Sequence, residues 1–348
     1  MAYISFQPKD HFNTKIYTGT GSENAITGIN FRPDWVWIKS RASANHRAFD
    51  AVRGATKAIY PSLSNAEGTA AQELKSFDSD GFTLGTESNV NANSTNFVSW
   101  NWKLGTTSGI TTNGSTTITP TAYSFNATSG MSAIKCAGTG AAGLFPHGLG
   151  VAPRIVITKD LTNSNSWFVQ TDLINSWTAS NYLVLNTTAA VGTNTGIVNA
   201  TDATNVSLYG SDDWVNASGR NYIHYCFTEK TGFSKFGTYV GNASASDNAF
   251  VYCGFKPAWV MTKCSSIAGD RWSVYDNKRD PINPTYRRLF PDGDIAESAN
   301  TDADIYLLSN GFKITNDTGT SGAAQTYIYM AFSEESIVSS NGVPAVAR

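Results

Sequence analysis

The chain has 348 residues, of which 15% are charged and 12% are aromatic, and its formal net charge is −2. A charge so close to zero gives no electrostatic reason to expect binding to nucleic acid or to an anionic membrane surface. No run of about eighteen apolar residues predicts a membrane-spanning helix, and the first residues lack the basic and apolar blocks of a signal peptide, so we expect synthesis in a cytoplasm.

A seven-residue pattern recurs along the chain, at residues 33–39, 153–159 and 257–263. Each copy has Pro first, Val fourth and Lys seventh, with a large apolar residue third and another apolar residue fifth. The copies start 120 and 104 residues apart (153 − 33 and 257 − 153). This spacing exceeds the roughly 20–50 residues of a solenoid repeat and fits a small domain repeated in tandem. Equivalent copies predict alike surroundings for three valines, Val36, Val156 and Val260.

Each copy is predicted to consist of β-strands, because Val, Ile, Trp, Tyr, Phe and Thr fill its segments and suit a pleated, half-buried surface. In chain order, the opening strands are expected at Lys15–Gly19, Ala133–Gly138 and Lys235–Gly241. The Pro-initiated pattern follows as the central strand. An aromatic strand closes each copy, at residues 97–102, 222–227 and 327–332. No long segment has the 3.6-residue period of a helix.

We therefore predict an all-β fold of three tandem antiparallel β-sandwich modules, lectin- or jelly-roll-like. The expected boundaries are an N-terminal arm at 1–12, modules at 13–104, 131–230 and 231–335, a linker at 105–130 and a C-terminal tail at 336–348. The linker is polar, uncharged and flexible by composition. Because the junction between the second and third copies is short, these two should pack closely, whereas the first copy should have more freedom.

The sequence shows no convergent catalytic constellation, so we predict no enzyme, no cofactor and no metal site. The four histidines have no metal-ligand spacing, and neither a nucleophile elbow nor a phosphate-binding Gly-rich loop is present. These histidines are His11, His46, His147 and His224. A glycan depolymerase would need two carboxylates. The candidates are Glu67, Asp78, Asp80, Glu297 and Asp304, which are more simply interpreted as solvated or turn-capping groups.

Other patterns also have both a structural and a functional interpretation. Residues 292–297 could hold Ca²⁺ through carboxylate oxygens but lack the full loop spacing. The four cysteines, without paired metal-like spacing, are expected to be buried free thiols; they are Cys136, Cys226, Cys253 and Cys264. The motif lysines are expected to point outward and blunt a sheet edge rather than bind a ligand; they are Lys39, Lys159 and Lys263.

Two further groups of side chains complete the sequence-based expectations. A structural ion pair is predicted between Asp50 and Arg53, and another between Asp276 and Arg279, because both pairs follow an aromatic residue with the same spacing. Exposed aromatic residues on loops are suited to stacking on sugars. These residues are Trp177, Tyr182, Trp214 and Tyr286.

Several segments of the chain resemble a family of virion structural proteins of tailed bacteriophages, common in marine phages and tail-fibre-like. They are residues 6–19, 31–39, 77–84, 147–153, 232–237, 276–281 and 342–348. The resemblance covers essentially the whole chain and implies a component of the virion, assembled in the host cytoplasm. It implies no active-site residues.

Three functions are compatible with that resemblance. The first is a tail-fibre or receptor-binding component that contacts host-surface glycans, where tandem modules would gain strength through multivalency. The second is a capsid decoration or head-fibre structural protein, and the third is a glycan depolymerase. The expected partners are other virion proteins, further copies of the chain in a homo-oligomer, with a trimer as first guess, and a host cell-surface glycan. Neither nucleic acid nor membrane insertion is expected.

Overall fold

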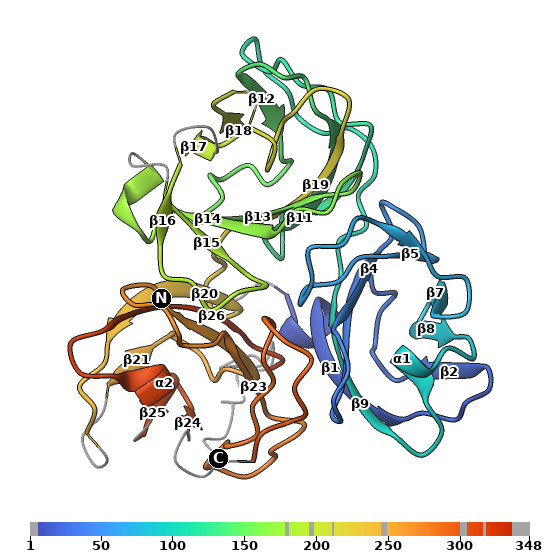
Figure 1. Ribbon diagram of the computed structural model, residues 1–348, viewed down its shortest axis with the longest axis vertical. Coiled ribbons are helices and arrows are strands. Elements are labelled where there is room, and N and C mark those ends of the chain that lie inside the picture. Colours follow the sequence, from blue (N-terminus) through green and yellow to red (C-terminus); the bar gives the residue numbers. More distant parts are fainter. Residues whose placement is uncertain are drawn as a thin grey trace.

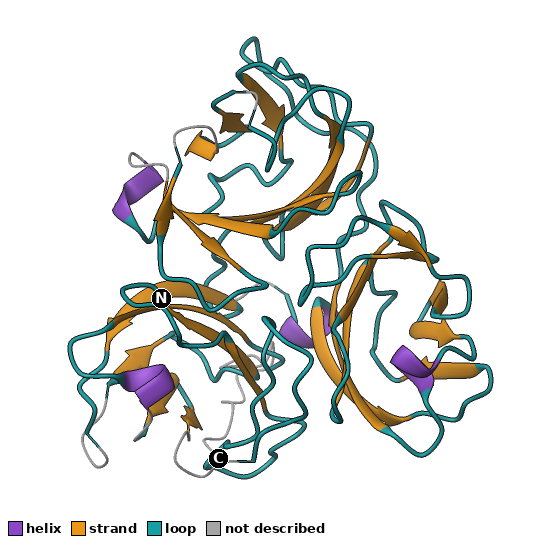
Figure 2. Ribbon diagram, in the orientation of Figure 1, coloured by secondary structure: helices purple, strands orange, loops and turns teal. Residues whose placement is uncertain are grey.

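The computed structural model describes residues 6–177, 181–194, 198–210, 212–244, 249–299, 305–315 and 318–335. Over these residues the chain is nearly all β, in several antiparallel sheets, as the sequence predicts (Figure 2). The described helical segments are short: α1 (Ser88–Asn91), α2 (Thr318–Ser321), η1 (Pro8–Asp10) and η2 (Asn175–Trp177). Within the described residues no helix combines the length and apolarity needed to cross a bilayer.

The strands form three groups around a common centre, in chain order from blue to red (Figure 1). The large sheet of the first group has the order β1 (Phe12–Thr18), β9 (Asn96–Trp102), β3 (Trp35–Ser40), β4 (Arg47–Asp50). Its small sheet has the order β2 (Asn24–Thr27), β8 (Gly81–Leu84), β7 (Leu74–Asp78), and β5 (Lys57–Ala58) pairs with β6 (Gly68–Thr69).

The second and third groups also combine a large and a small sheet. In the second group the large sheet runs β10 (Ala122–Asn126), β11 (Met131–Ala137), β19 (Asn221–Phe227), β13 (Ile155–Asp160), β14 (Trp167–Thr171), β15 (Asn181–Val184), β16 (Gly192–Thr193). The small sheet runs β12 (Gly143–Pro146), β18 (Asn205–Leu208), β17 (Val198–Thr201). In the third group the sheets run β20 (Ser234–Val240), β26 (Thr326–Phe332), β22 (Trp259–Cys264), β23 (Ser273–Asp276), and β21 (Phe250–Tyr252), β25 (Gly311–Ile314), β24 (Ile305–Leu308).

The three large sheets share one register around the central strand that carries the Pro-initiated pattern. Trp35 lies opposite Asp50 and Trp102, Ile155 opposite Thr171 and Phe227, and Trp259 opposite Asp276 and Phe332. Residues at the same offset in the three groups are therefore structurally equivalent, and they are compared as such below.

Alternation along the central strands divides their side chains between two cores, because successive residues of a strand point to opposite faces. Val36, Val156 and Val260 each lie in an apolar cluster confined to their own group, between its large and small sheets, as the repeat predicts. The residues on either side of each valine belong to a cluster shared by all three groups. These residues are Trp35, Trp37, Ile155, Ile157, Trp259 and Met261.

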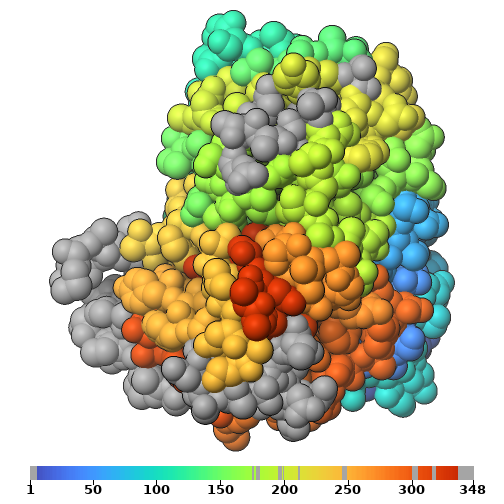
Figure 3. All heavy atoms as spheres, turned by 60° about the vertical axis from the view of Figure 1, so that its left-hand side comes forward, coloured from blue at the N-terminus to red at the C-terminus, as the bar shows by residue number. Residues whose placement is uncertain are grey.

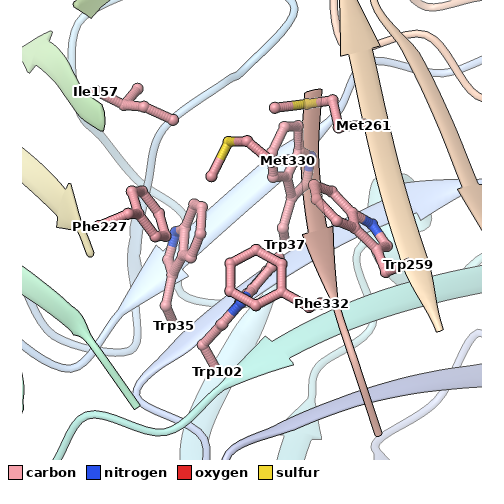
Figure 4. Close-up of a pocket in the computed structure, with 9 residues that line it drawn as sticks. All are labelled: Trp35, Trp37, Trp102, Ile157, Phe227, Trp259, Met261, Met330 and Phe332. Atoms are coloured by element: carbon pink, nitrogen blue, oxygen red, sulfur yellow. The ribbon is translucent and has the colours of Figure 1, made fainter. Parts of the chain in front are cut away.

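The shared cluster is a packed aromatic centre rather than a channel (Figure 4). Trp35 of the first group stacks on Tyr225 of the second at 4.8 Å between ring centroids. Trp102 of the first group meets Trp259 of the third edge-to-face at 5.8 Å. The cavity lined by Trp35, Trp102 and Trp259, among others, measures about 10 Å³, the space of a single water molecule. The first copy is thus held in the same core as the others, which differs from the freedom expected of it.

The segment 105–130, expected to be a linker, contributes ordered structure to the second group. Its β10 pairs with β11, and Thr106 exchanges two main-chain hydrogen bonds with Phe125. Ile118 is buried in the apolar cluster between the two sheets of that group. Composition did not indicate this, because widely spaced apolar residues among Thr, Ser and Gly do not produce the period-2 alternation of a strand.

The ends of the described chain bring the first and third groups together. Phe6 and His11, in the segment expected to form an arm, pack edge-to-face against Phe233 of the third group. Glu334, after the last strand, accepts a hydrogen bond from the main-chain N–H of Thr14 at 2.9 Å. The second group in turn lies directly against the third (Figure 3). The tail at 336–348 lies outside the described residues.

Candidate functional site

Three equivalent hydrogen bonds join the groups into a closed ring. In each, a buried ring N–H at or just before the start of β4, β14 or β23 donates to a main-chain carbonyl of another group. Trp167 Nε1 donates to Tyr60 O, Trp272 Nε1 to Val184 O and His46 Nε2 to Phe290 O, and each donor–acceptor distance is 2.9 Å. His46 Nδ1 accepts from Trp37 Nε1 at 2.8 Å, which places the imidazole proton on Nε2. The ring of contacts is therefore a structural feature of the whole molecule.

The motif lysines Lys39, Lys159 and Lys263 are fully buried, so the expectation that they point outward is wrong. Their strands lie between two neighbours, which leaves no edge for them to blunt. Each ammonium donates to two main-chain carbonyls: Ser40 and Ala42, Asp160 and Ser64, and Asp270 and Thr188, respectively. Burial lowers the pKa of Lys39 and of Lys159 to about 8, and it also lowers the pKa of Lys263.

The predicted Asp–Arg pairs are confirmed, and all four side chains are fully buried. Asp50 Oδ2 lies 2.5 Å from Arg53 Nε, and Asp276 Oδ2 lies 2.6 Å from Arg279 Nε. Glu67 and Glu297 complete the two clusters, at 3.2 and 3.1 Å from the Nη1 atoms of Arg53 and Arg279. Two depolymerase candidates are thus engaged in structural ion pairs.

These buried charges are matched across the group boundaries. Tyr225 of the second group donates to Asp50 at 2.5 Å, and Trp100 of the first group donates to Asp276 at 3.1 Å. In the second group, Thr171 and Ile174 stand where the other groups have the acid and the arginine. In the third group, Met330 stands at the position of the aromatic donors Tyr225 and Trp100. The buried acid and its aromatic donor are therefore present together or absent together, because either one alone would leave an unpaired polar group in the core.

The other candidate carboxylates hold local structure in the same way. Asp80 accepts the N–H groups of Gly28 and Asn30 at 2.9 and 2.6 Å, and these hydrogen bonds lower the pKa of Asp80. Asp78 accepts two hydroxyl groups of its own hairpin. Asp304 lies outside the described residues. The described candidates are therefore bound to separate partners, and the structure does not bring them to a common centre.

Metal and thiol chemistry receive no support among the described residues. No group of three or more metal-ligating side chains occurs there. In the segment proposed for Ca²⁺, Asp292 instead binds Arg271 Nη1 at 2.8 Å and the N–H of Trp272 at 3.0 Å. The cysteines are buried free thiols, as expected. Burial raises the pKa of Cys226 and of Cys253 to about 12, so the unreactive thiol is the form present near neutral pH.

The remaining histidines are enclosed rather than presented to a substrate. His147 accepts the N–H of Leu149 at 3.1 Å through Nδ1, and burial lowers its pKa. His224 lies 4.4 Å from Phe145 in a stacked pair, and burial lowers its pKa to about 3. Burial also lowers the pKa of His46 and of His11. Burial therefore favours the neutral form of each of these imidazoles.

Three of the four predicted sugar-stacking aromatics gather on the second group. Trp177, Tyr182 and Trp214 are half-buried and pack against the cluster between its two sheets. Phe168 joins them: its ring stacks on Trp214 with 4.2 Å between centroids and 8° between planes, and it meets Tyr182 at 5.5 Å. Tyr286 belongs to the third group, where the guanidinium of Arg287 lies over its ring. The aromatic cluster of the second group is defined here as Phe168, Trp177, Tyr182 and Trp214.

A buried amide lies beside this aromatic cluster. Gln170 is fully buried, and neither its Oε1 nor its Nε2 has a hydrogen-bond partner. It lies directly across the strand pair from Tyr182, and two residues along the same strand from Phe168. The equivalent positions of the other groups are apolar or aromatic, Phe49 and Tyr275. Sequence reasoning missed Gln170, although alignment of the three copies reveals it as the polar exception at an aromatic position.

The fold and these side chains define an all-β protein whose described candidate acids and motif lysines are engaged in structure and whose thiols are buried, with one aromatic cluster beside an unsatisfied amide. The chain belongs to the family described as a domain of unknown function (DUF7483), whose match spans residues 7–336. No curated protein and no solved structure matches it.

Proposed function

We propose that the protein is a non-enzymatic surface component of a bacteriophage particle, of the tail-fibre or receptor-binding kind, which contacts host-surface glycans. We further propose that it is three copies of one β-sandwich module. The phage origin rests on the sequence resemblance given above. The modular origin is supported by the shared register of the three large sheets and by the separate core that each group encloses.

The observation that carries glycan binding is the aromatic cluster of the second group. Aromatic faces stack on the C–H faces of sugars. Trp214 and Tyr182 are half-buried, so part of each ring remains open to a ligand, and the fully buried Gln170 beside Tyr182 keeps both amide groups without a partner. A buried unsatisfied amide costs about 1–3 kcal/mol, which favours a role other than packing.

Glycan binding is tested with purified protein on host cells and on an array of their surface polysaccharides. We expect retention on both, and loss of at least tenfold in affinity for Trp214→Ala. Tyr286→Ala, the aromatic residue of the third group, is the matched control and should bind as the unaltered protein does. The absence of binding to any cell or glycan would overturn the proposal, and release of reducing sugar would point to a depolymerase.

A capsid decoration or head-fibre role is the second candidate, and one observation favours it. β1 and β20 end their large sheets with one edge unpaired by any described strand, whereas β10 covers the equivalent edge of β11. Uncovered edges are places where another chain can pair. Immunogold labelling of particles distinguishes the two roles, because a decoration protein labels the capsid and a receptor-binding protein labels the tail.

A further inference from the structure

We propose that strand β21 pairs with the same strand of a second copy of the chain about a two-fold axis, so that the small sheets of two third groups join into one antiparallel sheet. The inference concerns a surface distinct from the aromatic cluster and does not depend on glycan binding. An edge strand presents unpaired N–H and C=O groups that can pair with another chain. A two-fold axis makes such a contact self-complementary, because each copy supplies the same surface.

Strand β21 places two aromatic side chains on the outside of the molecule. Its small sheet lies on the side of the third group away from the shared aromatic centre (Figure 1). Val251 points inward, because it belongs to the apolar cluster enclosed by the third group, so its neighbours Phe250 and Tyr252 point outward. These two residues are 48% and 64% exposed. On β2, which pairs with the Gly-Phe strand of the first group as β21 does in the third, the outward residues are the small Ala25 and Thr27.

The second group shows which main-chain groups face this edge. Leu144 of β12 is equivalent to Phe250, since each lies four residues before a glycine with positive φ. The N–H of Leu144 donates to Thr117 Oγ1 at 2.8 Å, and its carbonyl accepts the N–H of Ile118 at 2.9 Å. The residue at this position therefore directs both main-chain groups away from the neighbouring strand and toward the open edge.

This edge is closed in the second group and open in the third. Beside the bonded Leu144, the second group has Pro146 at the position of Tyr252, and proline has no N–H to donate. In the third group, Ala249 and Cys253 bond to the β25 side, so Phe250 and Tyr252 between them direct their N–H and C=O groups outward. Among the described residues, none is hydrogen-bonded to these outward groups.

The covering segment of the second group would not fit on the third. Ile118 packs beside Gly143, where a Cβ would come within 2.8 Å of Ile118 Cγ1. The equivalent residue of the third group is Ala249, whose Cβ takes that space. A segment cannot insert an isoleucine beside β21 as it does beside β12, which leaves pairing along the edge as the way to satisfy the outward groups.

One register of two antiparallel copies uses both outward residues. It places Phe250 opposite Tyr252 of the second copy, with Val251 on the two-fold axis. Each such pair joins residues whose main-chain groups face the edge, so it exchanges N–H···O=C bonds in both directions. Aromatic side chains opposite each other on neighbouring strands further stabilise this pairing. A register shifted by two residues would leave Phe250 or Tyr252 of each copy without an aromatic partner.

The charges near β21 permit contact with an identical strand. Natural edge strands often carry charged side chains that oppose such pairing. β1 and β20 contain Lys15 and Lys235, whereas β21 contains no charged residue. Lys313 lies on the adjacent strand, opposite Phe250. In the paired sheet the two copies of Lys313 would be three strand spacings apart, about 14 Å, which exceeds the screening length of about 8 Å at physiological salt.

Sedimentation equilibrium of the full chain over a range of protein concentrations tests the association. Because a strand of three residues buries less than the roughly 1,200–2,000 Å² of a stable interface, we expect a weak, reversible monomer–dimer equilibrium. Phe250→Lys should weaken dimer formation at least about tenfold, since a lysine on an edge opposes pairing. Ala25→Lys, at the equivalent exposed position of β2, is the matched control and should leave the equilibrium unchanged. A monomer at every concentration, a trimer, or a dimer that Phe250→Lys leaves intact would overturn the proposal.

Mixing two variants tests the register. Phe250→Lys and Tyr252→Glu should each associate poorly alone but form a heterodimer together, because the new charges of opposite sign then lie opposite each other. Phe250→Lys mixed with Phe250→Glu should not recover in this way, and recovery only in that second mixture would contradict the register.

Hydrogen exchange provides a test that needs no variant. In the unaltered protein, the amides of Phe250 and Tyr252 should exchange more slowly as the protein concentration rises, because the second copy covers them. Protection that is the same at all concentrations would show that a segment of the same chain covers the edge, and exchange that stays fast would show that nothing does. Either result would overturn the proposal.

Discussion

At the scale of single residues, Lys39, Lys159 and Lys263 are charged groups used as internal connectors. An ammonium offers three donors and no acceptor, which suits the carbonyls left unpaired where a strand ends and a loop begins. Lys159 and Lys263 each reach a carbonyl of another group, at Ser64 and Thr188. Burial removes water from the ammonium groups and so disfavours their charged form. The pKa values of Lys159 and Lys263 are lowered for this reason.

These lysines predict a pH dependence of stability. The pKa of Lys39 and of Lys159 is about 8 in the folded protein, against about 10.4 for an unfolded lysine. Between these values each lysine binds more protons in the unfolded chain than in the native protein, so its contribution to the free energy of unfolding rises with pH, by up to about 3 kcal/mol. Below the lower value both states are charged and the contribution is at its minimum.

The check is urea denaturation at pH 7, 8 and 9, below the ordinary tyrosine pKa of about 10. Because the buried cysteines, whose pKa values are raised, oppose this trend above about pH 8.5, the expected signal is a difference. The free energy of unfolding of the unaltered protein, relative to that of Lys39→Met or Lys159→Met, should increase with pH. Lys75→Met, at a lysine more than a third exposed, is the control and should leave the pH dependence unchanged. A difference that stays constant with pH would show that burial does not lower the pKa of these two lysines.

At the scale of elements, the segment 105–130 is the place where composition misleads. Ile118 is 3% exposed, its N–H donates to Leu144 O at 2.9 Å, and its side chain lies over Gly143, where a Cβ would come within 2.8 Å of Ile118 Cγ1. Ile118→Ala should therefore cost about 2–4 kcal/mol, the range for a large-to-small change in a core. Thr112→Ala, at an exposed position of the same segment, should change stability by less than about 0.5 kcal/mol.

Both variants are compared by urea denaturation at constant pH. If Ile118→Ala were as neutral as the threonine variant, the segment would behave as the flexible connector that its composition predicts. A loss confined to Ile118 would instead show that the segment contributes to the core of the second group.

The strands were predictable where the sequence repeats and obscure where it does not. The central strands could be read from the Pro, Val and Lys offsets, because period-2 alternation and β-branched residues act locally. The role of Lys39 could not, since exposure depends on which strands pair on either side. Gln170 and the ring from His46 to Phe290 likewise depend on contacts between segments far apart in sequence, which only the assembled fold supplies.

At the scale of the molecule, the shared aromatic core decides whether the three groups are independent. Each group encloses its own cluster, yet each also contributes a face to the common centre, where Trp35 contacts Tyr225 and Phe227 contacts Phe332. An isolated group would expose that aromatic face to water, at about 25 cal/mol for each Å² of apolar area. The groups should therefore fold and unfold as one unit, unlike modules joined only by linkers.

Three equivalent substitutions test this cooperativity: Val36→Ala, Val156→Ala and Val260→Ala. Each valine lies in the separate cluster of its own group, so each change should cost about 1–3 kcal/mol locally. With a shared core, calorimetry should show a single transition whose van't Hoff and calorimetric enthalpies agree, and each variant should move the whole transition to lower temperature. Independent modules would instead give separable transitions, and Val36→Ala would shift one of them while leaving the rest in place.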